Sequence, residues 1–161
     1  MKDGKLIGSV LFANCFVGSV QGSTFTPESV MPAGADSTIS INPYTGESGF
    51  ARKGTVAATL NNVARLNQLL SQEETPELKK EIVEISTAIA QLIPSLQAIG
   101  VFDLFEPTYW IGQGEQPGRI LALSLYLKHY PEKYTVALKE QLLKVKGSIS
   151  SPYLRERLDA L

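Results

Sequence analysis

A seam of apolar residues in the middle of the chain constrains the fold more than any other feature of the sequence. Its members recur at alternating intervals of four and three, and they are Leu78, Ile82, Ile85, Ile89, Leu92, Leu96 and Ile99. Such spacing is typical of a helix that buries one continuous stripe against partner helices. The stripe is wider than that of a coiled coil, because further apolar residues flank it: Val83, Ala88, Ala90 and Ile93. We therefore expect the wall of a compact bundle.

Capping signals give this helix its expected ends. Thr75 is a good N-cap, Pro76 suits the first helical position, and Gly100 suits the position just after the C-terminus. Pro94 lies inside the pattern, where a proline removes a backbone donor and clashes with the preceding turn. It predicts a kink or a break near Leu92.

Helical periodicity also covers most of the remaining chain after residue 50. A first helix is expected over residues 55–72, with the apolar face Val56, Leu60, Val63, Leu66 and Leu70. Its short connection to the seam helix predicts an antiparallel hairpin. The stretch 119–129 is apolar almost all round and should be the buried central helix, after a loop over 101–118. Further helices are expected over 132–146 and 151–161, giving a mainly all-α bundle of four to five helices.

The first 50 residues have a different composition. They carry six charges and seven of the thirteen glycines, with β-branched and aromatic residues in short runs. Short strands are expected within 6–20 and over 37–41, followed by a turn at 42–47. We expect residues 1–50 to form an irregular or short-β segment, packed on a single helical domain over 51–161.

The apolar run 6–20 also has some features of a targeting segment. It follows Lys2 and Lys5, as in a secretory signal peptide, but an acidic residue and an asparagine interrupt the pattern. The run is too short to span a bilayer. Cys15 is the single cysteine, so no disulfide framework can form. We expect a cytoplasmic protein, with export as the alternative if residues 1–22 act as a signal peptide.

Composition argues against several classes of function. The net charge of −1 gives no strong steering toward nucleic acid or an anionic membrane. The single His129 cannot build a multi-histidine metal site, and no acidic cluster has metal-loop spacing. No serine or cysteine has a histidine–acid pair evident in the sequence. We therefore predict no catalytic residue, metal, cofactor or nucleic-acid partner.

The start of the first helix is one candidate ligand site. Arg52, Lys53 and Thr55 surround Gly54, and two cations beside free helix N–H groups can bind a phosphate or carboxylate. Thr55 stands where a P-loop needs lysine, so a nucleotide-binding loop is excluded. The alternative is a solvated turn in which Thr55 is only an N-cap.

Asn61 and Asn62 lie further along the same helix, where asparagine is a poor helix former. At least one of the two amides should therefore have a specific hydrogen-bond partner. The partner could be a ligand, a neighbouring helix or a second subunit. A structural role is the favoured interpretation, because buried amides commonly set packing register.

The glycine-rich segment from Trp110 to Arg119 is the other candidate. Its glycines allow a ligand to approach the backbone, the indole offers a stacking face, and the arginine begins the next helix. The competing interpretation is an aromatic plug that closes one end of the bundle, made of Phe102, Leu104, Phe105 and Trp110.

Two motifs resemble a small family of bacterial domains of unknown function. One is the helix start Arg52-Lys53-Gly54-Thr55-Val56-Ala57-Ala58, continuing to Asn62. The other is the segment Ile99-Gly100-Val101-Phe102-Asp103-Leu104-Phe105-Glu106-Pro107-Thr108-Tyr109-Trp110-Ile111. The resemblance covers about residues 50–125 and implies a recurring domain, but it assigns no activity, ligand or catalytic residue.

Two hypotheses of function follow from these observations. The first is a non-enzymatic protein-interaction or structural domain, acting as a homo-oligomer or with a protein partner. The second is a binder of a small anionic ligand that uses the loops at 49–62 and 110–119, and an enzyme acting on such a ligand is one form of this hypothesis. A cavity shared by the two loops would favour the second hypothesis.

Overall fold

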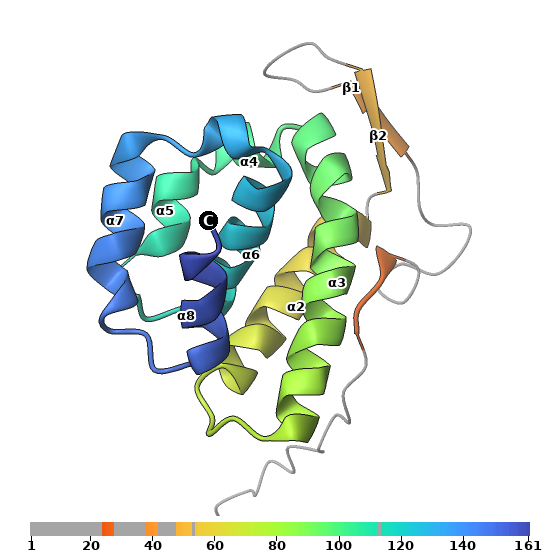
Figure 1. The fold of residues 1–161 in the computed structure, drawn as a ribbon. Helices are drawn as coiled ribbons and strands as arrows, with labels where there is room; N and C mark the ends of the chain where they lie inside the picture. Colours follow the sequence, from red (N-terminus) through yellow and green to blue (C-terminus); the bar gives the residue numbers. More distant parts are fainter. Residues whose placement is uncertain (1–23, 28–37, 42–47, 53, 113) are drawn as a thin grey trace, which may run out of the picture.

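Five longer helices and three short helical turns dominate the part of the chain that the structure describes (Figure 1). The computed structural model describes residues 24–27, 38–41, 48–52, 54–112 and 114–161. The longer helices are α2 (Gly54–Leu69), α3 (Pro76–Ala98), α6 (Pro117–His129), α7 (Val136–Lys146) and α8 (Pro152–Asp159). The short ones are α4 (Val101–Leu104), α5 (Pro107–Ile111) and η1 (Pro131–Lys133). The expected mainly α-helical bundle is confirmed.

Helix α3 carries the apolar seam and has the ends that its capping residues predict. The Thr75 hydroxyl accepts a hydrogen bond from the Leu78 N–H at 3.2 Å, and Gly100 adopts the left-handed conformation with φ 79°. The helix does not break at Pro94 but continues to Ala98. A proline can be tolerated there because the helix is held by packing along its length.

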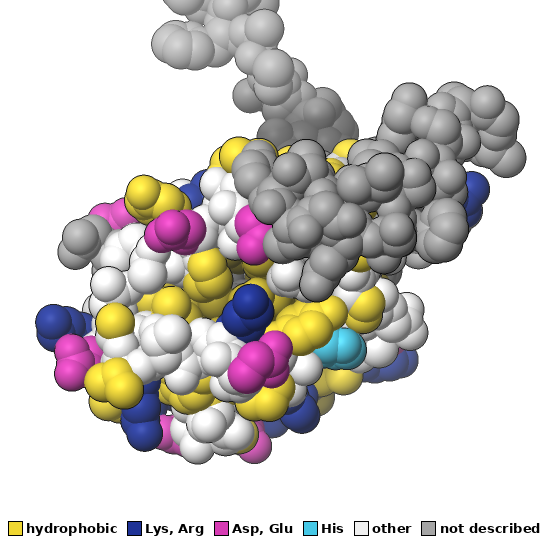
Figure 2. All heavy atoms as spheres, turned by 90° about the horizontal axis from the view of Figure 1, so that it is seen from above, with side chains coloured by type: hydrophobic (Ala, Val, Ile, Leu, Met, Phe, Trp, Pro, Cys, Tyr) yellow, Lys and Arg dark blue, Asp and Glu magenta, His cyan; other side chains and the backbone are white. Residues whose placement is uncertain are grey.

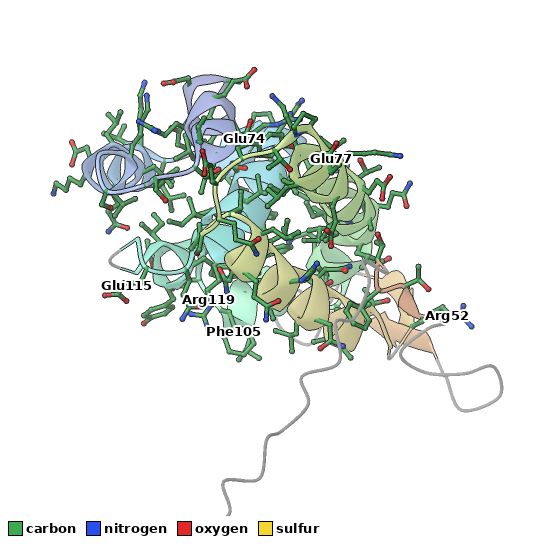
Figure 3. All side chains as sticks on the ribbon, turned by 90° about the horizontal axis from the view of Figure 1, so that it is seen from below. Arg52, Glu74, Glu77, Phe105, Glu115 and Arg119 are labelled. Carbon is green, nitrogen blue, oxygen red and sulfur yellow. The ribbon has the colours of Figure 1, made fainter. Side chains whose placement is uncertain are left out.

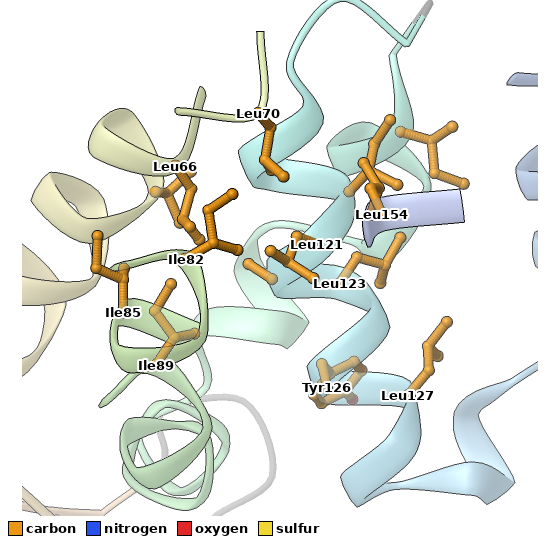
Figure 4. Close-up of a cluster of buried hydrophobic side chains, with 14 of the residues drawn as sticks. Leu66, Leu70, Ile82, Ile85, Ile89, Leu121, Leu123, Tyr126, Leu127 and Leu154 are labelled. Atoms are coloured by element: carbon orange, nitrogen blue, oxygen red, sulfur yellow. The ribbon is translucent and has the colours of Figure 1, made fainter. Parts of the chain in front are cut away.

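The core lies where α2, α3, α6 and α8 meet (Figure 4). The seam residues Ile82, Ile85 and Ile89 are each 1% exposed, and Ile93 takes the buried place that the regular seam assigns to Leu92. They pack with a cluster of buried side chains from the other helices that includes Leu66, Leu121, Leu123, Leu127 and Leu154. The seam therefore packs against other helices of the same chain.

Helix α6 is the central helix, as its all-round apolar composition predicts. It packs against α2, α3, α5 and α8, and eight of its residues are buried. Its first turn crosses α2 closely: the Gly118 N–H donates to Asn67 Oδ1 at 2.7 Å. The stretch before it is not the expected loop throughout, because α4 and α5 form there.

The described part of the N-terminal segment contains a small antiparallel sheet. Strand β1 (Thr38–Ile41) pairs with β2 (Ser48–Arg52), with a register irregularity between Ile39 and Ile41. This confirms the short strand expected over 37–41. The strands expected within 6–20 and the turn expected at 42–47 lie outside the described residues.

Candidate functional site

One apolar pocket of about 350 Å³ opens between α2 and the α4–α6 region. Five helices and one connection contribute to its walls, through Val56, Thr59, Leu60, Val63, Leu96, Val101, Phe105, Tyr109, Trp110 and Arg119. Helix α2 forms one wall because its residues at spacings of three and four lie on one face. Among the described lining residues, all but Thr59 and Arg119 are aliphatic or aromatic. We call this cavity the apolar pocket.

Aromatic stacking holds the Trp110 side of the apolar pocket in place. The Phe102 ring is 5.3 Å from the Trp110 ring and 3.9 Å from the Tyr126 ring, between centroids. The Trp110 Nε1–H donates to the Phe105 carbonyl at 2.9 Å.

Burial, and to a smaller extent the Asp103 carboxylate, raises the pKa of Tyr126 to about 12. The neutral Tyr126 hydroxyl donates to Gln97 Oε1 at 3.1 Å. The pocket wall is thus tied into the core.

The rim of the apolar pocket leaves large apolar side chains in water. Leu60 is 64%, Phe105 54% and Tyr109 71% exposed. The expected aromatic plug is therefore only partly correct: Phe102 is buried, whereas Leu104 is 55% exposed. The chain turns at Phe105 between two short helices, which directs these side chains outward instead of onto the bundle's end.

Arg119 places a positive charge on the pocket wall and stands at the start of α6. Its backbone N–H donates to the Gln116 carbonyl at 3.0 Å. Within the described part of the chain, no hydrogen bond or ion pair engages its guanidinium. Figure 3 shows Arg119 and Phe105 at one edge of the molecule and Arg52 at the opposite edge. A guanidinium beside apolar walls can recognise an anionic group on an otherwise apolar molecule.

The structure brings only two of the candidate ligand residues together. Trp110 and Arg119 share the apolar pocket, whereas Arg52, Thr55, Asn61 and Asn62 do not line it. Lys53 lies outside the described residues. The 49–62 segment of the second hypothesis contributes other residues to the pocket, namely Val56, Thr59 and Leu60 of α2.

Thr55 and Asn62 have structural contacts instead. Thr55 is 2% exposed and lies within the first turn of α2 rather than at the N-cap, and its carbonyl accepts from the Thr59 hydroxyl at 2.9 Å. Asn62 is fully buried: its Oδ1 accepts from the Phe25 N–H at 2.9 Å and its Nδ2 donates to the Phe25 carbonyl at 2.8 Å. One of the two asparagine amides therefore has the specific partner that the sequence predicts, and that partner is backbone.

Most residues of the apolar wall could not be recognised as pocket residues from their sequence pattern. Val56 and Leu60 were expected on the buried face of the first helix, and Tyr109 in a loop. Aliphatic and aromatic residues carry no chemical signature that separates a pocket wall from a core. The available signal was the nearby Arg119, whose charge needs an aqueous or ionic neighbour.

The histidine and the acidic residues are further candidates for a site outside the apolar pocket, within the part of the chain that the structure describes. His129 lies exposed at the end of α6, with its ring 4.8 Å from that of Tyr130, and Figure 2 shows it in cyan at the surface. Among the described residues, no three His, Cys, Asp or Glu side chains gather as metal ligands would. None of the described helices has the length and apolar run needed to cross a membrane.

Comparisons with known proteins place the chain in a family. No curated protein and no solved structure gives a match. A family model described as "Domain of unknown function (DUF7709)" matches residues 46–129, which is more than half of the 161 residues. The matched region runs from just before β2 to the end of α6 and includes every residue that lines the apolar pocket. The chain belongs to the DUF7709 family of domains of unknown function.

Proposed function

We propose that this protein is a non-enzymatic binding domain whose binding site is the apolar pocket. One observation carries the proposal: a cavity of about 350 Å³ has nearly continuous aliphatic and aromatic walls. That volume lies in the range of small-molecule sites, which run from roughly 300 to 1,000 Å³ and are mostly apolar. A ligand seated there would also cover the exposed rim side chains Leu60, Phe105 and Tyr109.

The chemistry of the walls supports binding rather than catalysis. Among the described residues that line the apolar pocket, none is a carboxylate, histidine, cysteine or lysine. The hydroxyl of Thr59 is already donated to the Thr55 carbonyl, and the indole N–H of Trp110 to the Phe105 carbonyl. General acid–base or nucleophilic chemistry needs a titratable group within reach of the substrate, and among the described lining residues only Tyr109 and Arg119 carry one.

The test is a fluorescence titration with the neutral apolar dye N-phenyl-1-naphthylamine. We expect Leu60→Asp to weaken binding at least tenfold, because it places a charge at the rim of the apolar pocket. Leu143→Asp is the matched control, since Leu143 is 60% exposed on α7 and lies outside the pocket, compared with 64% for Leu60. An absence of dye binding, or an equal loss in both variants, would contradict the proposal.

A protein partner is the second candidate, favoured by the extent of exposed apolar surface. Leu104 and Phe105 are 55% and 54% exposed and extend the apolar rim beyond the pocket, and surfaces of this kind often mark interaction sites. If a second copy covers them, light scattering coupled to size exclusion should show a dimer that Phe105→Asp converts to a folded monomer. A monomeric wild type would exclude a homo-oligomer.

We also expect a cytoplasmic location, because a single cysteine supports no disulfide framework.

A further inference from the structure

We propose that the apolar pocket takes an amphipathic ligand with one carboxylate, and that Arg119 binds the carboxylate while the apolar body fills the cavity. This inference rests on the proposed function and adds the chemical class of the ligand. It follows from three observations. The Arg119 side chain lines the apolar pocket, its guanidinium has no partner among the described residues, and a more polar hollow lies next to it.

Arg119 is an exposed residue of the pocket wall, and its guanidinium donors are available to a ligand. The hydroxyl of Thr59 and the indole N–H of Trp110 already donate to backbone carbonyls. The Arg119 guanidinium, by contrast, has no hydrogen bond or ion pair with any residue that the structure describes. Its planar fork of donors matches a carboxylate, which it can bind through two parallel hydrogen bonds. A bound carboxylate therefore gains a partner without displacing an internal contact.

Arg119 also stands at the junction of two cavities. Together with Tyr109 and Trp110 it lines both the apolar pocket and a smaller hollow of about 90 Å³. The other residues of the smaller hollow include Gly112, Glu115 and Gln116, so this side is more polar. Figure 3 shows Glu115, Arg119 and Phe105 along the same part of the surface. A head group at Arg119 would stay in contact with water while the body of the ligand is buried.

Glu115 limits the charge of the head group. Glu115 and Arg119 both line the smaller hollow, so a ligand group placed there lies near one acidic and one basic residue. A single negative charge can pair with the guanidinium, but a doubly charged phosphate adds repulsion from Glu115. The arrangement therefore favours a monocarboxylate over a phosphate monoester.

The experiment compares ligands that share one apolar body and differ in the head group. Decanoate, decanol and decyl phosphate displace N-phenyl-1-naphthylamine from the full chain at concentrations below micelle formation. The pair 2-naphthoate and 2-naphthol provides the same comparison of carboxylate and hydroxyl on an aromatic body. Comparing the two sets shows whether the pocket prefers an alkyl or an aromatic ligand. We expect a carboxylate of either body to bind about five- to tenfold more tightly than its alcohol, as for a partly exposed ion pair. Decyl phosphate should bind more weakly than decanoate.

Two variants assign the preference to Arg119. Arg119→Gln should abolish the advantage of the carboxylate while the affinity of the alcohol stays within twofold. Lys128→Gln is the control, because it removes one positive charge from an exposed position at the other end of α6. It should leave the advantage unchanged. Arg119 is exposed, so both variants are expected to fold, which circular dichroism checks.

The outcomes separate the two proposals. Dye binding with no preference for either carboxylate, or a preference that survives Arg119→Gln, overturns the carboxylate inference and leaves the binding domain standing. Tighter binding of decyl phosphate than of decanoate also overturns it. Failure of the dye itself to bind overturns the proposed function, and the inference with it.

Discussion

At the residue scale, Asn62 shows how one amide anchors a distant segment. Both of its polar atoms are used by the backbone of Phe25, 37 residues earlier, in a fully buried position. The same segment lies tightly against the start of α2, since a Cβ on Gly54 would come 2.4 Å from the Pro27 carbonyl oxygen. Because asparagine is a poor helix former, the sequence predicted a partner for at least one of the amides of Asn61 and Asn62, but it could not identify a partner so far away in the chain.

Asn62→Ala should therefore release residues 24–27 and lower the free energy of unfolding by about 1–3 kcal/mol, because buried backbone groups lose their partners. Hydrogen exchange at the Phe25 amide and urea denaturation measure the two effects. Asn61→Ala is the matched control: Asn61 is exposed, and its loss should change stability by less than about 0.5 kcal/mol. Equal effects of the two variants would show that the amide contact is not specific.

Two buried tyrosines offer a second comparison at this scale. The Tyr126 hydroxyl donates to Gln97, whereas the Tyr153 hydroxyl is buried and has no hydrogen-bond partner among the residues that the structure describes. Tyr126→Phe should lower the free energy of unfolding by about 1 kcal/mol, while Tyr153→Phe should leave it unchanged or raise it, because an unsatisfied buried hydroxyl is costly. Urea denaturation of both variants is the measurement. A loss of 1 kcal/mol or more in Tyr153→Phe would reveal a partner for that hydroxyl.

At the element scale, the crossing of α2 and α6 depends on a residue without a side chain. A Cβ on Gly118 would come 2.4 Å from the Val63 carbonyl oxygen and 2.8 Å from the Asn67 N. Backbone cannot move aside as a flexible side chain can, so the two helices would have to separate. The sequence showed Gly118 only as part of a glycine-rich segment, because a close approach between helices leaves no local pattern.

Gly118→Ala should lower the free energy of unfolding by about 1–3 kcal/mol, as expected for overpacking. Gly147→Ala is the contrasting variant: a Cβ there meets nothing within 4 Å and the backbone is right-handed helical, with φ −63°. It should raise stability by about 0.4–1 kcal/mol through the unfolded state. Thermal and urea denaturation measure both changes in stability. The same change in Gly118→Ala and Gly147→Ala would contradict the close approach of α2 and α6 at Gly118.

The elements themselves were largely predictable from local patterns. A hydroxyl cap followed by a proline stands at the start of both α3 and α8 in the sequence: the Ser151 hydroxyl accepts from the Leu154 N–H at 3.3 Å, as the Thr75 hydroxyl does from the Leu78 N–H. The short helices α4 and α5 were not predicted, because four- and five-residue helices show too little periodicity. Pro94 predicted a kink or break, but packing along α3 keeps the helix continuous.

At the scale of the whole molecule, the seam of α3 belongs to the core. Ile85 is 1% exposed, so Ile85→Asp buries an unpaired charge and should unfold the protein instead of producing a folded monomer. Circular dichroism and light scattering distinguish these results. Val83→Asp provides the comparison on the same helix, because Val83 is 40% exposed and the variant should stay folded. A folded Ile85→Asp monomer would instead place the seam at a subunit interface.

The sequence by itself determined the longer helices and most of the core, because helix caps and apolar periodicity are local properties of the chain. It also selected Trp110 and Arg119 as candidate ligand residues from their chemistry. Only the tertiary structure decided that these two face Leu60 and Val56 across one cavity, and that Arg52 lies elsewhere. The reason is physical: a pocket wall and a core face have the same apolar pattern. The difference between them is whether a neighbouring helix fills the space, and that depends on how α2, α5 and α6 pack.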